Sequence, residues 1–244
     1  MSETLLFSAV PVLAILGFGF MLGLKHATEA DHLAAVSTIV AERKSLWSST
    51  FIGGLWGLGH TISLFFVGVL VLFLDLQISE RTERILEFCV GIMLTFLGLN
   101  VLRKLLKGGK FHFHAHEHGA REHVHPHIHV AESEEAHTHH GLKFNPRALV
   151  IGMIHGLAGS AALMLLVIPT IESKTVGLLY ILVFGGGSIG GMMLMSFLVG
   201  LPFHFTAARH NRFNYILQSI AGFVSIALGL LIVYEKGITE GLFS

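Results

Sequence analysis

The sequence is poor in charge and has a single cysteine. Only 13% of its 244 residues are charged, against roughly 25% in soluble domains, while 52% are hydrophobic and the mean hydropathy is +0.70. Basic and acidic residues balance at 16 each, so no net positive charge favours nucleic-acid binding. Cys89 has no second cysteine with which to form an internal disulfide. The composition therefore indicates an integral membrane protein.

Three familiar motifs are also missing. No basic segment precedes the first apolar run, so we expect a retained first helix rather than a signal peptide. The phosphate-binding pattern GxxxxGK[ST] does not occur, so any transport would be secondary or would need a partner ATPase. The protease motif H-E-x-x-H is absent as well.

Long apolar segments are what the sequence does contain. A hydrocarbon core of ~30 Å takes about 20 helical residues to cross. Six segments reach that length: 5–24, 51–74, 85–106, 148–170, 176–201 and 213–235. We predict a seventh, shorter helix at 26–41; the alternative is six spans, with 5–41 as one broken or re-entrant segment. The expected fold is an all-α polytopic membrane protein with about seven transmembrane helices.

The two halves of the chain resemble each other. "ILEFCVGIMLTFLGL" (85–99) and "ILQSIAGFVSIALGL" (216–230) match at six of fifteen positions, and two further pairs of segments show similar offsets of 129 and 131 residues. We therefore divide the chain into an N-terminal transmembrane half (1–106), a histidine-rich loop (107–146) and a C-terminal transmembrane half (147–244). An inverted three-helix repeat is expected, with a binding site between the halves.

Basic residues predict the orientation. With seven spans, one side of the membrane holds eleven Lys and Arg and the other holds five. The richer side faces the cytoplasm by the positive-inside rule. We therefore expect a multi-pass protein of the cytoplasmic membrane, with the N-terminus and the histidine-rich loop inside.

The stretch "GLKHATEADHLAAVSTIV" places several ionisable groups between two apolar runs. A carboxylate at a membrane-helix centre costs roughly 2.5–3.5 kcal/mol, so such groups persist mainly where they bind something or line a polar path. On a regular helix Asp31 points about 120° away from His26. If His26, Asp31 and His32 bind one ion, the backbone must depart from an ideal helix near His26, and Gly23 offers a place for the break.

Other polar groups occur inside the apolar runs. His60 and His155 both fall near the middle of predicted spans, with glycines around them, and Ser160 follows His155. Glu29 either joins the site or pairs with Lys25 on the helix surface. Imidazole together with carboxylate suits a borderline divalent ion such as Ni²⁺, Co²⁺ or Zn²⁺. We take His60 as a fourth ligand or a gate, and Glu29, His155 and Ser160 as additional ligand or pathway candidates.

The loop between the halves is dominated by histidine. Eleven of the protein's 17 histidines lie in it, and it has no apolar face, so we expect it to be disordered and to buffer metal ions. These histidines are His112, His114, His116, His118, His123, His125, His127, His129, His137, His139 and His140.

The motifs resemble those of a known family. "HATEADH" reads H-x4-D-H, "LGHT" stands at 58–61, and "HGLAGSAAL" stands at 155–163. This pattern is similar to the nickel/cobalt transporter (NiCoT) family, especially its short urease-accessory nickel permeases. The resemblance implies metal ligands at His26, Asp31, His32 and His60. Lys25 and Glu29 depart from the family's usual arginine and aspartate, which leaves the metal and its coordination number open.

We therefore expect uptake of Ni²⁺ or Co²⁺ across the cytoplasmic membrane, with the ion as cargo and no resident cofactor. The alternatives are efflux of Ni²⁺, Co²⁺ or Zn²⁺ by the same architecture, a metal sensor or store that uses only the loop, and, ranked lower, an intramembrane metalloenzyme. The expected partners are the lipid bilayer, the divalent ion and a cytoplasmic metallochaperone. The sequence gives no oligomeric state.

Overall fold

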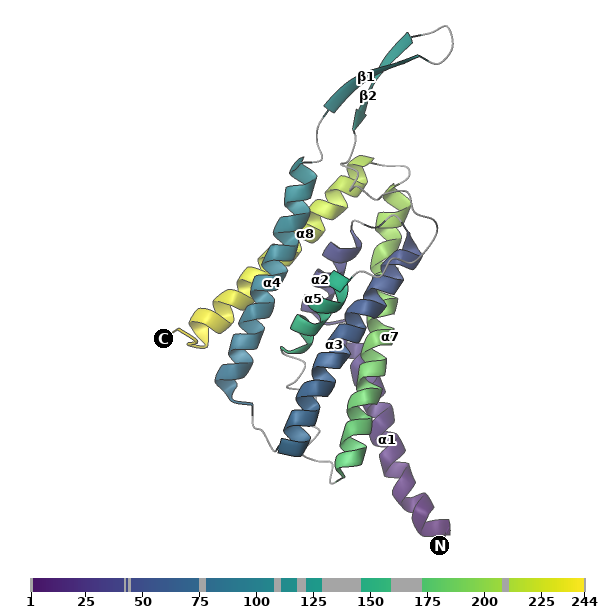
Figure 1. Cartoon of the computed structure of the whole chain (residues 1–244), viewed down its shortest axis with the longest axis vertical. Coiled ribbons are helices and arrows are strands. Elements are labelled where there is room, and N and C mark those ends of the chain that lie inside the picture. The colour runs from purple at the N-terminus through teal and green to yellow at the C-terminus, as the bar shows by residue number, and fades with distance from the viewer. Residues whose placement is uncertain are drawn as a thin grey trace.

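The computed structural model describes residues 2–41, 43, 45–74, 78–107, 111–117, 122–128, 146–158, 173–207 and 211–243. Helices form an elongated bundle, and a two-stranded ribbon extends from one end of it (Figure 1). The helices are α1 (Ser2–His26), α2 (Ala30–Val40), α3 (Leu46–Leu74), α4 (Glu80–Lys107), α5 (Pro146–Gly156), α7 (Lys174–Ala207), α8 (Asn211–Tyr234) and the π-helix η2 (Glu235–Thr239). The expected all-α polytopic membrane fold is confirmed.

The number of full spans is smaller than predicted in the part of the chain described. Four helices, α3, α4, α7 and α8, are long and apolar enough to cross a membrane, and α1 with α2 forms a pair bent by 56° that adds a fifth span if the two cross as one. The predicted helix 26–41 exists as α2, but its 11 residues reach only about 16 Å. This fits the six-span alternative, in which 5–41 is one broken or re-entrant segment.

The predicted helix 148–170 is also shorter than expected where it can be seen. Its described part, α5, ends at Gly156, and the chain turns over 157–158. Gly156 lies against the backbone of His60, where a Cβ atom would collide. A glycine, which has low helix propensity, is thus the last residue of α5, at the level of the site.

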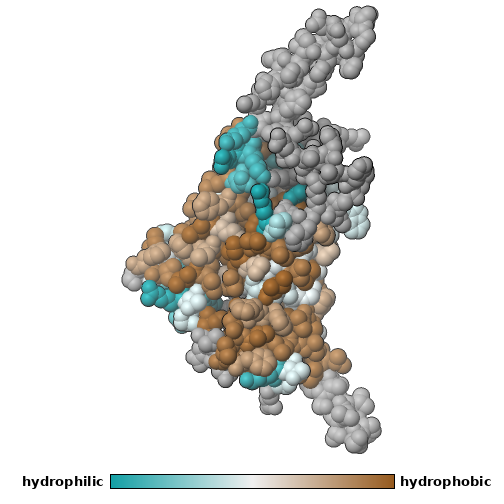
Figure 2. Space-filling view, in the orientation of Figure 1, coloured by the Kyte–Doolittle hydropathy of each residue, from teal (hydrophilic) through white to brown (hydrophobic). Residues whose placement is uncertain are grey.

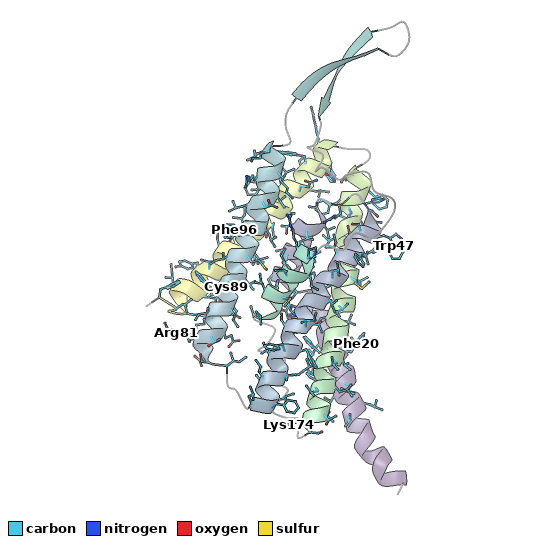
Figure 3. All side chains as sticks on the ribbon, viewed as in Figure 1. Phe20, Trp47, Arg81, Cys89, Phe96 and Lys174 are labelled. Carbon is cyan, nitrogen blue, oxygen red and sulfur yellow. The ribbon has the colours of Figure 1, made fainter. Side chains whose placement is uncertain are left out.

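The outer surface fits a membrane. Hydrophobic residues cover the middle of the bundle, and hydrophilic ones gather toward its two ends (Figure 2). Large apolar side chains such as Phe66, Phe96 and Phe223 are exposed. Trp47, at the start of α3, is 79% exposed, as is common for tryptophan at a membrane–water interface (Figure 3).

The helices pack with an approximate two-fold pattern. α3 packs against α7 and α4 against α8, while α1 contacts α7 and α5 contacts α3. In the α4–α8 pair, Gly91 lies against the carbonyl of Gly229, and Gly98 lies against that of Gly222. The sequence repeat aligns Gly91 with Gly222 and Gly98 with Gly229, so exchanging the halves turns one contact into the other. This is the packing that an inverted repeat produces.

The N-terminus and the ribbon lie at different ends of the bundle (Figure 1). Arg81 and Lys174 mark the end of the bundle opposite the ribbon (Figure 3), and the N-terminal end of α1 points the same way (Figure 1). The N-terminal end of α1 is therefore drawn away from the ribbon. That the N-terminus and the histidine-rich loop share the cytoplasmic side stays a prediction. The C-terminal segment returns to the start of α4, where Arg84 donates to the Glu240 carbonyl.

The ribbon lies in the histidine-rich segment. Strands β1 (Phe111–Glu117) and β2 (Glu122–Ile128) pair antiparallel, where the sequence predicted no regular structure. The alternation of histidine with apolar residues in "FHFHAH" is the strand signal that the prediction overlooked. Opposite one another stand three histidine pairs: His112–His127, His114–His125 and His116–His123. His118, His129, His137, His139 and His140 lie outside the described residues.

Candidate metal centre

A helix break creates the site. α1 ends at His26, and α2 begins at Ala30, so three residues lie between them. In between, the Thr28 N–H donates to the Lys25 carbonyl (2.8 Å) and the Glu29 N–H to the His26 carbonyl (3.1 Å). The predicted departure from ideal helix is thus present. It does not fall at Gly23, which is packed within α1 against the backbone of α7.

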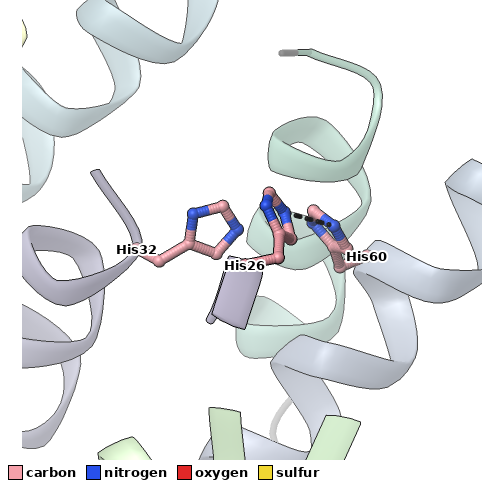
Figure 4. A group of neighbouring side chains, drawn as sticks. All are labelled: His26, His32 and His60. Carbon is pink, nitrogen blue, oxygen red and sulfur yellow. Dashed lines mark hydrogen bonds between the residues drawn. The ribbon is translucent and has the colours of Figure 1, made fainter. Parts of the chain in front are cut away.

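Three buried histidines converge at this break. His26 comes from the end of α1, His32 from α2 and His60 from the middle of α3, and their rings lie close together (Figure 4). One nitrogen of each lies within 4.8 Å of the others, and each residue is at most 2% exposed. The Nε2 atoms of His26 and His60 are 3.2 Å apart. Two ligands about 2.05 Å from a tetrahedral ion stand about 3.3 Å apart, so the pair already has the separation of two metal ligands.

A second group lies beside the first and shares His32. The Asp31 Oδ1 atom is 2.9 Å from His32 Nδ1, and the Asp31 Oδ2 atom is 3.0 Å from His155 Nε2. The three ligand atoms lie within 4.8 Å of one another. The opposite nitrogen of His32, Nε2, has no hydrogen-bond partner among the described residues. His32 therefore offers a nitrogen to each group.

The sequence did not single out Trp56, which supports both groups. Its ring lies 5.4 Å from that of His32 and 5.4 Å from that of His155, and it is 1% exposed. On the other side, Phe184 lies 5.8 Å from His26. These aromatic rings limit the positions that the imidazoles can adopt. A tryptophan in the apolar segment around "GLWGLGH" carries no signal that separates this role from ordinary packing.

Helix ends add electrostatic stabilisation for a cation. α1 ends at His26 and α5 ends one residue after His155, so two helix C-termini, with their partial negative charge, point at the site. Asp31 lies in the first turn of α2, where the partial positive charge favours a carboxylate, and it accepts the His32 N–H at 2.8 Å. The broken backbone thus stabilises both the acid and a positively charged guest.

Glu29 contacts a histidine of the site, which is one of the two roles predicted for it. Its Oε2 atom lies 2.9 Å from Nδ1 of His26, and its side chain is 40% exposed. No ion pair between Glu29 and Lys25 occurs among the residues described. Nδ1 of His26 has no hydrogen-bond partner among the described residues, so Glu29 acts on this histidine through its charge. Ser160 lies outside the described residues.

Only part of the site is repeated in the second half. Gly23 meets the carbonyl of Phe184, and its counterpart Gly152 meets that of Trp56, so α3 and α7 correspond at an offset of 128 residues rather than the 131 predicted. This offset places the buried Ser188 at the position of His60. His155 corresponds to His26 and is the histidine that the second half keeps.

A comparison with known proteins gives one clear relative. The urease accessory protein UreH of Bacillus sp. (strain TB-90) is 41% identical over 234 residues, which is 96% of this chain and 96% of the relative. No established family profile and no solved structure matches the chain. The likeness therefore extends over nearly the whole of both proteins.

Proposed function

The chain belongs to the family of the urease accessory protein UreH, and from this premise we propose that it carries Ni²⁺ into the cell across the cytoplasmic membrane. The observation that carries the proposal is the convergence of four buried histidines and Asp31 at a helix break inside the bundle. The relative is named as an accessory protein of an enzyme, which favours a supporting role over catalysis.

The donor set supports a late first-row divalent ion. Neutral imidazole with a single carboxylate suits Ni²⁺, Co²⁺ and Zn²⁺, whereas Mg²⁺ and Ca²⁺ prefer oxygen ligands. The described residues place no cysteine near the site, since Cys89 is exposed on α4 (Figure 3). Among these ions the resemblance to the nickel/cobalt transporter family favours Ni²⁺, with Co²⁺ second.

The two groups suggest an order of events. Asp31 is 29% exposed on its side chain, while His26, His32 and His60 are almost fully buried. An ion entering from solvent therefore meets Asp31, His32 and His155 first, where the negative charge lowers the cost of shedding water. It then passes to His26 and His60 through His32. Rocking of one repeat against the other exposes it to the second side.

The ribbon would act after the ion has crossed. It lies at the end of the bundle where basic residues are abundant, the cytoplasmic side by the positive-inside rule (Figure 1). Three cross-strand histidine pairs there would hold arriving ions and pass them to a cytoplasmic metallochaperone.

The test is Ni²⁺ flux in proteoliposomes. Asp31→Asn keeps the size of the side chain and removes its charge, so uptake should fall by about 100-fold. Glu80→Gln, which removes an exposed acid at the start of α4, should leave it unchanged. Equal rates for wild type and Asp31→Asn would remove the site from the mechanism.

Direction is tested in whole cells. Expression should raise the accumulation of ⁶³Ni. Loss of ⁶³Ni from the cells on expression would show that the protein exports the ion, which is the efflux alternative that the sequence left open.

A further inference from the structure

A cavity leads from the second metal group toward the surface. Its volume is about 100 Å³, which is room for several water molecules or a partly hydrated ion. Its lining brings Asp31 and His155 of the second metal group together with Glu87 on α4 and Lys236 in η2. The described residues that line it are Asp31, Glu87, Val90, His155, Ala158, Ile232 and Lys236.

An ion pair lines this cavity. Lys236 Nζ lies 2.8 Å from Glu87 Oε2 and 2.6 Å from Glu240 Oε1. Glu240 in turn faces Arg84, whose Nε lies 3.7 Å away, and Arg84 also pairs with Glu80. Among the described residues, Lys236 is the only ion-pair partner of Glu87. The charge of Glu87 is thus balanced by one ammonium group.

We propose that Glu87 is an outer binding point for the divalent cation on its way to Asp31, and that Lys236 occupies it until the cation arrives. The inference rests on the proposed function and extends it to a site outside the H-x4-D-H cluster. Arrival of M²⁺ replaces one ammonium contact with a stronger divalent one. No bond is made or broken in the exchange beyond these ionic contacts.

The second partner of Lys236 makes this exchange feasible. When the cation takes Glu87, the ammonium group keeps its contact with Glu240 at 2.6 Å, so it is not left unpaired in an apolar wall. A monovalent ion has half the charge with which to displace it. The Glu87–Lys236 pair would therefore favour divalent over monovalent cations at the mouth of the cavity.

The local backbone and the position of the pair are consistent with this role. Lys236 lies in a π-helical turn, a rare conformation that is frequent at functional sites. Glu87 lies near the start of α4, toward the end of the bundle opposite the ribbon. By the positive-inside rule this is the extracytoplasmic end, from which an imported ion must enter.

The experiment is Ni²⁺ influx into proteoliposomes at varied Ni²⁺ concentration. Glu87→Gln should raise KM by about tenfold and leave kcat near that of wild type, because the inner ligands are intact. Lys236→Met should lower KM, since the competing ammonium group is gone. The matched control is Glu80→Gln, which makes the same change about two turns earlier on α4 at a side chain that is 86% exposed and outside the cavity.

A double variant separates binding from structural support. If Glu87 binds the ion, Glu87→Gln with Lys236→Met should keep the raised KM of the single glutamine variant. Recovery of the wild-type KM would show that Glu87 only neutralises Lys236 and would overturn the inference, as would a Glu87→Gln variant indistinguishable from Glu80→Gln. Wild-type protein that moves no Ni²⁺ in the same vesicles would instead overturn the proposed function.

Discussion

At the scale of single residues, His155 is the side chain whose role depends most on tertiary contact. Its Nε2 atom meets Asp31, so His155→Gln removes a ligand and an anchor for the carboxylate together. Ni²⁺ affinity should fall by about 10–100-fold, the range seen when groups that orient metal ligands are removed. Equilibrium binding to purified protein lacking residues 111–141 measures this without the loop histidines.

His204→Gln is the matched control for that prediction. His204 lies near the end of α7 and belongs to neither metal group, so its loss should leave the affinity unchanged. Equal losses for the two variants would mean that His155 contributes only a general effect of histidine removal.

The sequence was informative where burial alone implied a partner. Acids and imidazoles next to an apolar run must converge on something, and this reasoning predicted one site from His26, Asp31, His32 and His60. The structure instead groups His26 and His60 with His32, and sets Asp31 with His32 and His155. It could not rank His155, because no acid stands near it in the chain. Glu87 and Lys236 were overlooked because each stands at the edge of a predicted span, where charged residues are common.

At the scale of helices, Gly23 sets how closely α1 approaches α7. A Cβ atom there would collide with the Phe184 carbonyl, so Gly23→Ala should push α1 outward and displace His26 from His60. We expect a lower thermal unfolding temperature together with weaker Ni²⁺ binding. Gly17→Ala on the same helix meets nothing within 4 Å and should be neutral or stabilising by about 0.4–1 kcal/mol. Equal behaviour of the two variants would contradict close packing at Gly23.

The ribbon gives a prediction about pH. The register pairs six histidine positions across the two strands, so we expect the ribbon to bind up to about three ions. Metal needs neutral imidazole, whose ordinary pKa is about 6.5, so this binding should be present at pH 7.5 and lost as the pH falls through 6.5.

The measurement compares Ni²⁺ bound per chain at pH 7.5 and 5.5 for the full protein and for a deletion of 111–141. The extra ions should disappear with either change, while the deletion keeps transport. Loss of all transport on deletion would favour a sensor or store over a carrier.

Element lengths were predicted well where a span is uniformly apolar and poorly where it breaks. α3, α4, α7 and α8 follow the predicted segments within a few residues. The end of α5 could not be read from composition, because Gly156 resembles Gly152, which packs as closely against α3 inside the helix. The predicted offset between α3 and α7 differed from the observed one by three residues, because glycine-rich segments align almost equally well at several registers.

At the scale of the whole molecule, the N-terminus lies at the end opposite the ribbon and the C-terminus lies beside the first turns of α4 (Figure 1). In a Cys89→Ser background, single cysteines at Ser2→Cys and Leu242→Cys should react with an impermeant thiol reagent on intact cells. Ala115→Cys should react only after the cells are permeabilised. Labelling of the Ser2 position together with the Ala115 position would instead restore seven full crossings.

The shared imidazole of His32 has a kinetic consequence. If the ion left all its ligands between the two metal groups, it would need a new hydration shell inside the membrane, and this would slow every transport cycle. His32 has Nδ1 toward Asp31 and Nε2 on the other edge of the same ring. The ion can therefore exchange its ligands one at a time and stay coordinated throughout. Throughput would then be limited by ligand substitution on the metal, so cargo that exchanges its ligands faster than Ni²⁺ would pass sooner even when it is held less tightly.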